Sequence, residues 1–355
     1  MPSDPARLPA KIRRWSQELG FQQTGITDTN LQEAEQRLQH WLAKGYHGEM
    51  NFMAQHGLKR SRPAVLIENT RSIISVRLDY LPEPQSTIEK RLHDPATAFI
   101  SRYALGRDYH KLMRHRLQKL AHQIEQDVGP FGYRAFVDSA PVLEKAIAEK
   151  AGLGWIGKHS NLINRKAGSW FFLGEIYTDL KLPADPPAKN HCGHCTACID
   201  ICPTQAIVDP YQVDARLCIS YLTIELKTAI PEPLRPLIGN RIYGCDDCQL
   251  ICPWNRFAHL SAEKDFSPRH RLDSAQLVEL FAWDEKTFLK NTEGSAIRRI
   301  GHERWLRNIA VALGNGPKSE AVIQALNQRL SDCTELVAEH IHWALQRLTS
   351  CSSQA

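Results

Sequence analysis

The stretch HCGHCTACIDICPTQAI, residues 191–207, decides how this 355-residue chain is to be understood. Four of its cysteines fall within eleven residues in the spacing C-x2-C-x2-C-x3-C, and a proline follows the last one. A second stretch, GCDDCQLICPWN at 244–255, repeats the final C-x2-C-x3-C-P part of this pattern. The first question is therefore which group these cysteines hold, and what the rest of the chain needs it for.

The cysteines are concentrated in one segment, because eight of the ten lie between Cys192 and Cys252. The N-terminal residues lack the apolar region of a signal peptide, and no apolar run reaches the length of a membrane span. We therefore expect a cytoplasmic protein without a membrane partner, in which thiols stay reduced. A dense cysteine cluster in that setting indicates metal binding, whereas Cys333 and Cys351 are expected to be ordinary thiols.

Zinc is the simplest alternative for such a cluster, since zinc sites use pairs of C-x2-C separated by a spacer. The longer run C-x2-C-x2-C-x3-C-P is instead typical of bacterial ferredoxins, in which the fourth cysteine binds the other cluster. The second stretch lacks one cysteine, and Cys218 can supply it. We predict two [4Fe-4S] clusters, one on Cys192, Cys195, Cys198 and Cys252 and the other on Cys202, Cys218, Cys245 and Cys248. We expect the flanking His191 and His194 to be surface residues and not ligands.

The remaining sequence predicts an α+β multidomain protein. Residues 1–180 mix helical and strand patterns and are expected to form an α/β domain, with α+β as the alternative. The proline-rich segment after them opens a ferredoxin-like domain over 181–260, and residues 261–355 are expected to be entirely helical. Within that last part, 294–316 and 319–348 resemble paired helices of a HEAT-like repeat. The net charge of +5 is too small to indicate a nucleic-acid partner by itself.

Local patterns predict the elements of the first domain. Helices are expected over 31–45, 108–129 and 139–152, and strands over 71–81, 133–138, 160–164 and 169–180, the last two as a hairpin. Gly152, Gly154 and Gly157 form a G-x-G-x-x-G pattern, but a helix precedes it and strands follow it. This order is the reverse of a dinucleotide-binding fingerprint, so we expect a tight turn. Asp138 precedes the helix with an early proline and could simply cap it.

Five motifs together resemble the epoxyqueuosine reductase family, and the resemblance covers nearly the whole chain. The motifs are SRYALGRDYHKLMR (101–114), VDSAPVLEKAIAEKAGLGWIGKHSNLI (137–163), CGHCTACIDICPTQAI (192–207), CISYLTIE (218–225) and YGCDDCQLICPWN (243–255). The resemblance implies an enzyme that reduces the epoxide of epoxyqueuosine at the wobble position of tRNAs for Tyr, His, Asn and Asp. It also implies a low-potential electron donor, which the sequence does not identify, and we expect a monomer.

The resemblance further implies a cobalamin between the first domain, which would be similar to nitroreductase and cobalamin-processing folds, and the ferredoxin-like domain. The family's catalytic aspartate falls on Asp138, and we expect burial to raise its pKa so that it can donate a proton. The other residues that the resemblance places along the corrinoid are Arg60, Ser101, Lys158, Ser220, Asp246 and Asp247. The nearest match to a cobalamin histidine motif, at Asp108–Met113, lacks the glycine. We therefore expect base-off cobalamin, with His110 an ordinary residue on a helix face.

A basic segment near the C-terminus is the candidate tRNA contact. Residues 286–307 hold six Lys/Arg and only two Glu, and the candidate arginines are Arg298, Arg299, Arg304 and Arg307. Phosphate contacts there would position the anticodon arm.

Two other functions fit the cysteine pattern. The first is a reductive dehalogenase, which also combines two clusters with base-off cobalamin but is usually exported with a twin-arginine signal. The second is a non-catalytic electron-transfer module, which would need neither the first domain nor the helical tail.

Overall fold

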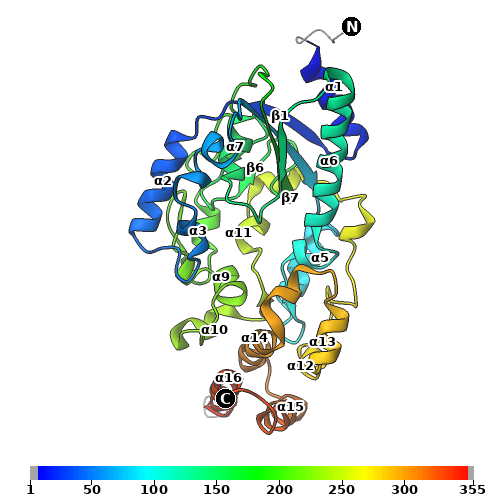
Figure 1. The fold of residues 1–355 in the computed structure, drawn as a ribbon. Helices are drawn as coiled ribbons and strands as arrows, with labels where there is room; N and C mark the ends of the chain where they lie inside the picture. The colour runs from blue at the N-terminus through cyan, green and yellow to red at the C-terminus, as the bar shows by residue number, and fades with distance from the viewer. Residues whose placement is uncertain (1–6, 351–355) are drawn as a thin grey trace.

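The computed structural model describes residues 7–350, so Cys351 lies outside the described residues. Figure 1 shows the first half of the chain at one end, around a twisted sheet, and the C-terminal helices stacked at the other end. The segment with the cysteines runs between them, and its helix α11 lies close to the sheet. Residues far apart in the sequence therefore meet at the middle of the molecule.

The central sheet has four strands in the order β1-β2-β7-β4, and all its pairs are antiparallel. The strands are β1 (Gln23–Thr27), β2 (Ser72–Asp79), β3 (Phe99–Ile100), β4 (Tyr133–Phe136), β5 (Trp155–Ile156), β6 (Leu162–Ile163), β7 (Phe171–Thr178), β8 (Ile207–Asp209), β9 (Gln212–Val213) and β10 (Arg241–Tyr243). Every residue of β2 and β7 is buried, as expected for central strands covered on both faces. Because no strand pair of this sheet is parallel, the first domain is α+β, so the α/β prediction is wrong and the α+β alternative holds.

The helices cover both faces of this sheet and form the far end of the molecule. The α-helices are α1 (Leu8–Glu18), α2 (Gln32–Ala43), α3 (Phe52–Gln55), α4 (Pro63–Leu66), α5 (Gln85–Leu92), α6 (Tyr109–Val128), α7 (Glu144–Lys150), α8 (Ala197–Asp200), α9 (Ile219–Ile224), α10 (Arg235–Ile238), α11 (Asp247–Leu250), α12 (Leu277–Phe281), α13 (Glu285–Asn291), α14 (Gly301–Asn315), α15 (Glu320–Leu330) and α16 (Glu335–Ser350). The 3₁₀ turns are Gly57–Arg60, Arg102–Ala104, Ala215–Leu217, Glu232–Leu234, Pro253–Phe257, Lys264–Phe266 and Ala296–Ile300.

Helix α6 begins and ends where the sequence predicts. The Asp108 side chain caps it by accepting a hydrogen bond from the backbone N–H of His110. Gly129 ends it with a φ of 86°, a conformation that glycine adopts without strain. This precise start matters for function, because it fixes the first turn of α6 beside the candidate site.

Three expectations for the first domain are wrong. The helix expected over 139–152 begins only at Glu144, because the preceding residues form tight turns in which the Ser139 N–H bonds to the Val137 oxygen and the Val142 N–H to the Ala140 oxygen. Asp138 has a φ of +40° and turns the chain instead of capping the helix. The expected hairpin does not form either, since β6 pairs with β5 while β7 pairs with β2 and β4. As an inner strand of the sheet, β7 pairs on both sides and buries all eight of its residues, which is more apolar surface than a two-stranded hairpin would bury.

The hydrophobic cores cross the expected domain boundaries. One core joins Ile100 and Leu105 of the first part to Tyr243 of the cysteine segment and to helices α12, α14 and α16. The segment around β3 therefore packs helices α12, α14 and α16 against the first domain, and β3 also pairs with β10 of the cysteine segment. Among residues 7–350, no helix combines the length and apolar character needed to cross a membrane.

Candidate active site

Two cavities meet at the end of β4. The inner pocket, about 370 Å³, lies between α6, β7, the cysteine segment and the turn before α14. The outer pocket, about 850 Å³, lies between α2, α7 and the loop before Ala215. Asp138, Glu144 and Lys145 line both cavities. Each volume is within the range of ligand-binding pockets, roughly 300–1,000 Å³, and the shared carboxylates mark their junction.

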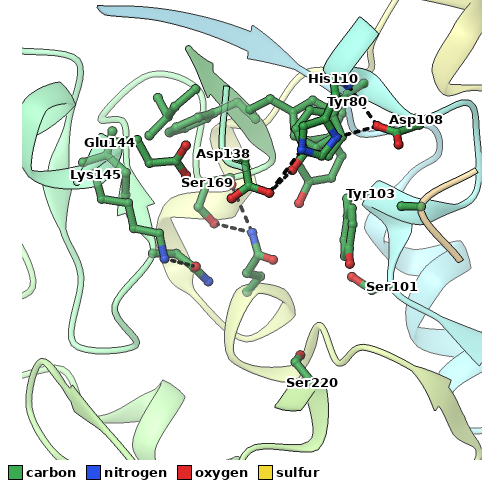
Figure 2. A pocket seen from close by; sticks show the side chains of 18 of the residues that line it. Tyr80, Ser101, Tyr103, Asp108, His110, Asp138, Glu144, Lys145, Ser169 and Ser220 are labelled. Carbon is green, nitrogen blue, oxygen red and sulfur yellow. Dashed lines mark hydrogen bonds and ion pairs between the residues drawn. The ribbon is translucent and has the colours of Figure 1, made fainter. Parts of the chain in front are cut away.

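Asp138 is held at this junction by the first turn of α6. Its Oδ2 accepts a 2.7 Å hydrogen bond from the Tyr109 hydroxyl, and Nε2 of His110 lies 3.5 Å away. Tyr109 is itself fixed by stacking on Phe172, with ring centroids 3.7 Å apart. Figure 2 shows the Asp138 carboxylate pointing toward His110, with Glu144 beside it and Ser101 and Ser220 on other walls of the pocket. Aspartate is among the few residues that tolerate a positive φ, which suits this position.

The electrostatics of Asp138 differ from the expectation. Desolvation pushes its pKa upward although about half of the side chain is exposed, but the Tyr109 hydrogen bond, the ion pair with His110 and the charge of Lys145 outweigh it, so the pKa is lowered. The expected rise is therefore wrong, and Asp138 is ionised at neutral pH. Burial lowers the pKa of His110, yet its bonds to Asp108 and Asp138 raise it to about 9. His110 is thus a protonated member of the site and not an ordinary helix residue.

Two buried glutamates behind Asp138 were not singled out by the sequence. Burial, with the nearby charge of Asp138, raises the pKa of Glu144 to about 8. Burial also raises the pKa of Glu175 well above its ordinary value, with Glu144 and Asp138 adding to the shift. The signal for Glu175 was present in the sequence, because a lone glutamate inside the apolar strand FFLGEIYT has no structural purpose there.

The first predicted cysteine set is brought together around one cavity. Four side chains, Cys192, Cys195, Cys198 and Cys252, line a space of about 220 Å³ near the surface. Lys158 closes one side by donating to the backbone oxygens of Gly193 and Cys195 at 2.8 and 2.9 Å. His191 also lines this cavity, so it lies nearer the first cysteine set than we expected, although it and His194 are both exposed.

The second set gathers between the first set and the inner pocket. Burial is the main cause of the raised pKa of the Cys218 thiol, and the nearby Cys202 adds to it. The pKa of the Cys248 thiol is likewise raised, mainly by burial and further by the nearby Cys218. Cys245 lines the inner pocket directly. A cluster on this second set would therefore form part of the pocket wall.

The residues expected along the corrinoid divide into two groups. Arg60 lines the outer pocket, and Ser101 and Ser220 line the inner pocket. The other three, Lys158, Asp246 and Asp247, line neither pocket, so their place along the corrinoid stays a prediction. Asp246 is fully buried and accepts from the Ser101 hydroxyl at 2.5 Å and the Arg102 backbone N–H at 2.9 Å. Asp247 is ion-paired with Arg241, so both aspartates brace the cysteine loop from behind.

The four candidate tRNA arginines are also not equivalent. Arg307 is fully buried and donates to the backbone oxygens of Leu222, Leu226 and Thr228, so its assignment as a phosphate contact is corrected. Arg304 donates hydrogen bonds of 2.7–2.9 Å to three backbone oxygens, so its guanidinium is already engaged within the chain. Arg299 pairs with Glu225 and lines the inner pocket. Arg298 is exposed and forms no ion pair within residues 7–350.

Comparison with protein-family models defines the class first. Residues 191–255 match the model "4Fe-4S double cluster binding domain", which agrees with the two cysteine groups and excludes the zinc alternative. With a titratable pocket beside the second group, the chain is an iron–sulfur oxidoreductase. Residues 60–139 match the model "Epoxyqueuosine reductase QueG, DUF1730", and this range contains Tyr109, His110 and Asp138.

Full-length relatives then identify the family. The chain is 62% identical to an epoxyqueuosine reductase of Pseudomonas aeruginosa over 347 residues, which is 98% of this chain and 96% of the relative. It is 60% identical to the Escherichia coli enzyme of the same name, over 97% of this chain and 90% of the relative. The chain belongs to the epoxyqueuosine reductase family.

Solved structures show the same fold. A crystal structure of selenomethionine-labelled epoxyqueuosine reductase matches with a TM-score of 0.89 and 26% identity, over 97% of this chain and 91% of that chain. The Bacillus subtilis enzyme, described with its catalytic loop swung out of the active site, matches with a TM-score of 0.87 and 25% identity, over the same shares. A third, an epoxyqueuosine reductase with an epoxyqueuosine-modified tRNA-Tyr stem loop, matches with a TM-score of 0.83 and 24% identity, over 98% and 100% of the two chains.

Proposed function

We propose that this reductase acts on epoxyqueuosine at the wobble position of tRNA, with Asp138 as the proton donor. The observation that carries the proposal is the junction of the two cavities. Asp138 lies there beside two groups that can carry protons, the hydrogen-bonded Tyr109 and the ion-paired His110, and the inner pocket has a predicted cluster cysteine in its wall. A reductase needs an electron entry and a proton entry at one cavity, and this pocket offers both.

The cavities fit a cobalamin. The outer pocket is large, and within the described residues the Nε of its Arg60 is buried without a hydrogen-bond partner, which an acceptor on a ligand would satisfy. His110, the histidine of the inner pocket, faces Asp108 at 2.6 Å through Nδ1 and Asp138 through Nε2. A protonated imidazole between two carboxylates has no lone pair for a metal. These features support a base-off corrinoid, which would supply reduced cobalt as the electron-donating centre.

The chain's own residues would then handle binding and protons. Ser101 and Ser220 offer hydroxyls toward the inner pocket, and Arg60 anchors the outer end. Removing an epoxide oxygen consumes two electrons and two protons and leaves an alkene and water. Asp138 is positioned to deliver a proton to the departing oxygen, a contribution of roughly 10²–10⁴-fold for general acids. Since Asp138 is ionised at rest, it must first receive that proton from a neighbour.

Electrons would enter through the first cysteine set and leave through the second. The first set lines a cavity that includes the exposed Cys195, so a donor protein can approach it. The second set includes Cys245 in the wall of the inner pocket. The order of the two sets therefore supports a single-electron path from the surface to the site, fed by a low-potential donor.

The tRNA would reach the inner pocket past the turn that precedes α14. Arg299 lies in the pocket wall and Arg298 is exposed beside it, so this turn supports a contact with the phosphates of the anticodon arm. The wobble base would leave its stack to enter the cavity. The tRNAs for Tyr, His, Asn and Asp are the proposed substrates.

The test is an anaerobic assay with reconstituted protein, cobalamin, a chemical reductant and an epoxyqueuosine-containing stem loop. Mass spectrometry of the digested RNA should show loss of one oxygen from the modified nucleoside. The same assay without cobalamin should show no loss. Conversion that is equally fast without cobalamin would contradict the cofactor assignment, and absence of conversion with bound cobalamin and intact clusters would contradict the substrate. Organohalides offered in parallel test the dehalogenase alternative.

A further inference from the structure

The central strand β7 carries an ionisable side chain where none is needed for folding. Glu175 is fully buried, and within the described residues neither of its carboxylate oxygens has a hydrogen-bond partner. In the sheet it lies opposite Ser75 of β2 and Phe136 of β4, and the Ser75 hydroxyl lies near enough to lower the pKa of Glu175 without reaching the geometry of a full hydrogen bond. Leaving such a carboxylate ionised inside a protein costs several kcal/mol, so Glu175 is held as the neutral acid.

Glu175 faces the side of the sheet that α7 covers. Its strand neighbour Tyr177 packs on that side with Ile73 and with Ile147 of α7. Glu144, the first residue of α7, therefore lies on the same side. Electrostatic contacts link Glu175 with Glu144 and Asp138, so the three carboxyls form one group. This group extends from the sheet interior to the junction of the two cavities.

Glu144 connects the interior to the cavities. It lines both pockets, and its Oε2 is buried with no partner in the described part of the chain. The groups that face it are Asp138, whose backbone N–H bonds to it, Lys145, His110 and Glu175. Tyr177 and Ser75 complete the surroundings of Glu175. Figure 2 shows the Glu144 carboxyl next to Asp138, on the side of Asp138 away from Asp108.

We propose that Glu144 and Glu175 form a proton reserve that reloads Asp138 during turnover. This inference rests on the proposed function, because only a proton-consuming reaction at Asp138 needs a reserve. Glu175 lies in the sheet interior, and both glutamates act through Asp138, so they are positioning residues for the proton. Two buried acids behind one donor match the two protons that each epoxide reduction consumes.

The transfer balances at each step. Glu144 in its acid form gives its proton to the Asp138 carboxylate, which leaves Glu144 ionised and Asp138 neutral. Glu175 then gives its proton to Glu144, and solvent protons reload the pair through the outer pocket, which Glu144 also lines. Asp138 passes its proton to the departing oxygen. The electrons come from the low-potential donor through the clusters, so no other reductant is required.

Infrared spectroscopy of the cofactor-free protein tests the reserve without turnover. Wild-type protein should show at neutral pH the carbonyl stretch of buried carboxylic acids, shifted in D₂O. Glu175→Gln should remove one component, and Glu144→Gln should remove a component that disappears as pH rises through about 8. Glu89→Gln, on the exposed side of α5, is the matched control and should leave the spectrum unchanged. A wild-type spectrum without such a band overturns the proposal.

Kinetics of the holoenzyme supply the second arm. In Glu144→Gln the value of kcat should fall at least about tenfold, as expected when a proton-transfer step loses its donor, with KM for the tRNA unchanged. Wild-type kcat should fall as pH rises through about 8, and this fall should be absent in the variant. A wild-type kcat and pH profile in Glu144→Gln, or a change in KM alone, overturns the proposal. If Glu175→Gln does not fold, Glu144→Gln and the wild-type spectrum decide. A wild-type enzyme that fails to reduce epoxyqueuosine contradicts the proposed function, and the infrared arm still decides the protonation of the pair.

Discussion

Replacing Asp138 with Asn separates the proton donor from everything else in the pocket. The amide keeps the size of the carboxylate, can still accept the 2.7 Å hydrogen bond from Tyr109, and tolerates the φ of +40°. It can neither hold nor deliver a proton to a leaving oxygen. We therefore expect intact clusters, cobalamin binding and tRNA affinity, with turnover at least about 100-fold slower, the lower end of general-acid contributions.

The structure adds a second, independent signature for this variant. His110 lies 3.5 Å from Asp138, and loss of that negative charge should lower the pKa of His110 from about 9. The assays are single-turnover reduction of an epoxyqueuosine stem loop under anaerobic conditions and NMR titration of the histidine in cofactor-free protein. Asp28→Asn, at a surface ion pair with Lys150, is the control and should match the wild type. Near-wild-type turnover of Asp138→Asn would refute the assignment, because the proton would then come from another group.

Three further predictions concern the clusters, the tRNA and pH. Cys245→Ser should reduce the iron content of anaerobically reconstituted protein from about eight to about four per chain, whereas Cys333→Ser should leave it unchanged; equal loss in both would contradict the ligand assignment. Arg298→Glu should weaken stem-loop binding and reduce the slope of log affinity against log salt by about one, whereas Arg14→Glu on α1 should not; an unchanged slope would place the contact elsewhere. The raised pKa of His110, about 9 against 6.5, gives stability that is fully present below pH 6.5 and is lost as pH rises through 9. The unfolding free energy that His110→Gln loses should therefore be about 3 kcal/mol at pH 6 and near zero above pH 9, measured by denaturant unfolding, and a gap that grows with pH would contradict this.

The sequence predicted best where local rules decide the structure. The long helix α6 has its Asp108 cap and Gly129 end in the sequence itself, and the spacing of Cys192, Cys195 and Cys198 is set by the geometry of one cluster loop. The sequence-based predictions failed where the partners of a residue or strand come from distant parts of the chain. The strand β7 was expected in a hairpin, but its partners are β2, about a hundred residues away, and β4, which precedes α7, β5 and β6. Arg307 looked like part of a basic surface, and only the fold brings the backbone oxygens that bury it.

The same limit applies to the chemistry of Asp138. From the sequence, burial was the only visible influence on this carboxylate, and burial alone raises a pKa. The opposing influences belong to Tyr109 and His110, some thirty residues earlier, which reach Asp138 only because the cap at Asp108 fixes the first turn of α6. The sequence therefore pointed to the right residue, Asp138, but predicted the protonated form where the structure indicates the ionised one.

An ionised Asp138 also ties proton uptake to electron delivery. Cys245 and Asp138 line the same pocket, so each electron that arrives at the cysteine wall adds negative charge near the carboxylates. Negative charge nearby favours the protonated form of an acid. We therefore expect Asp138 to be protonated only after the pocket has been reduced, with Glu144 as the adjacent acid already carrying a proton. Before reduction, Asp138 is ionised and has no proton to donate, so an electron that arrives without substrate is not consumed together with a proton. Reduction of the pocket then raises the pKa of Asp138, and each turnover begins with its protonation.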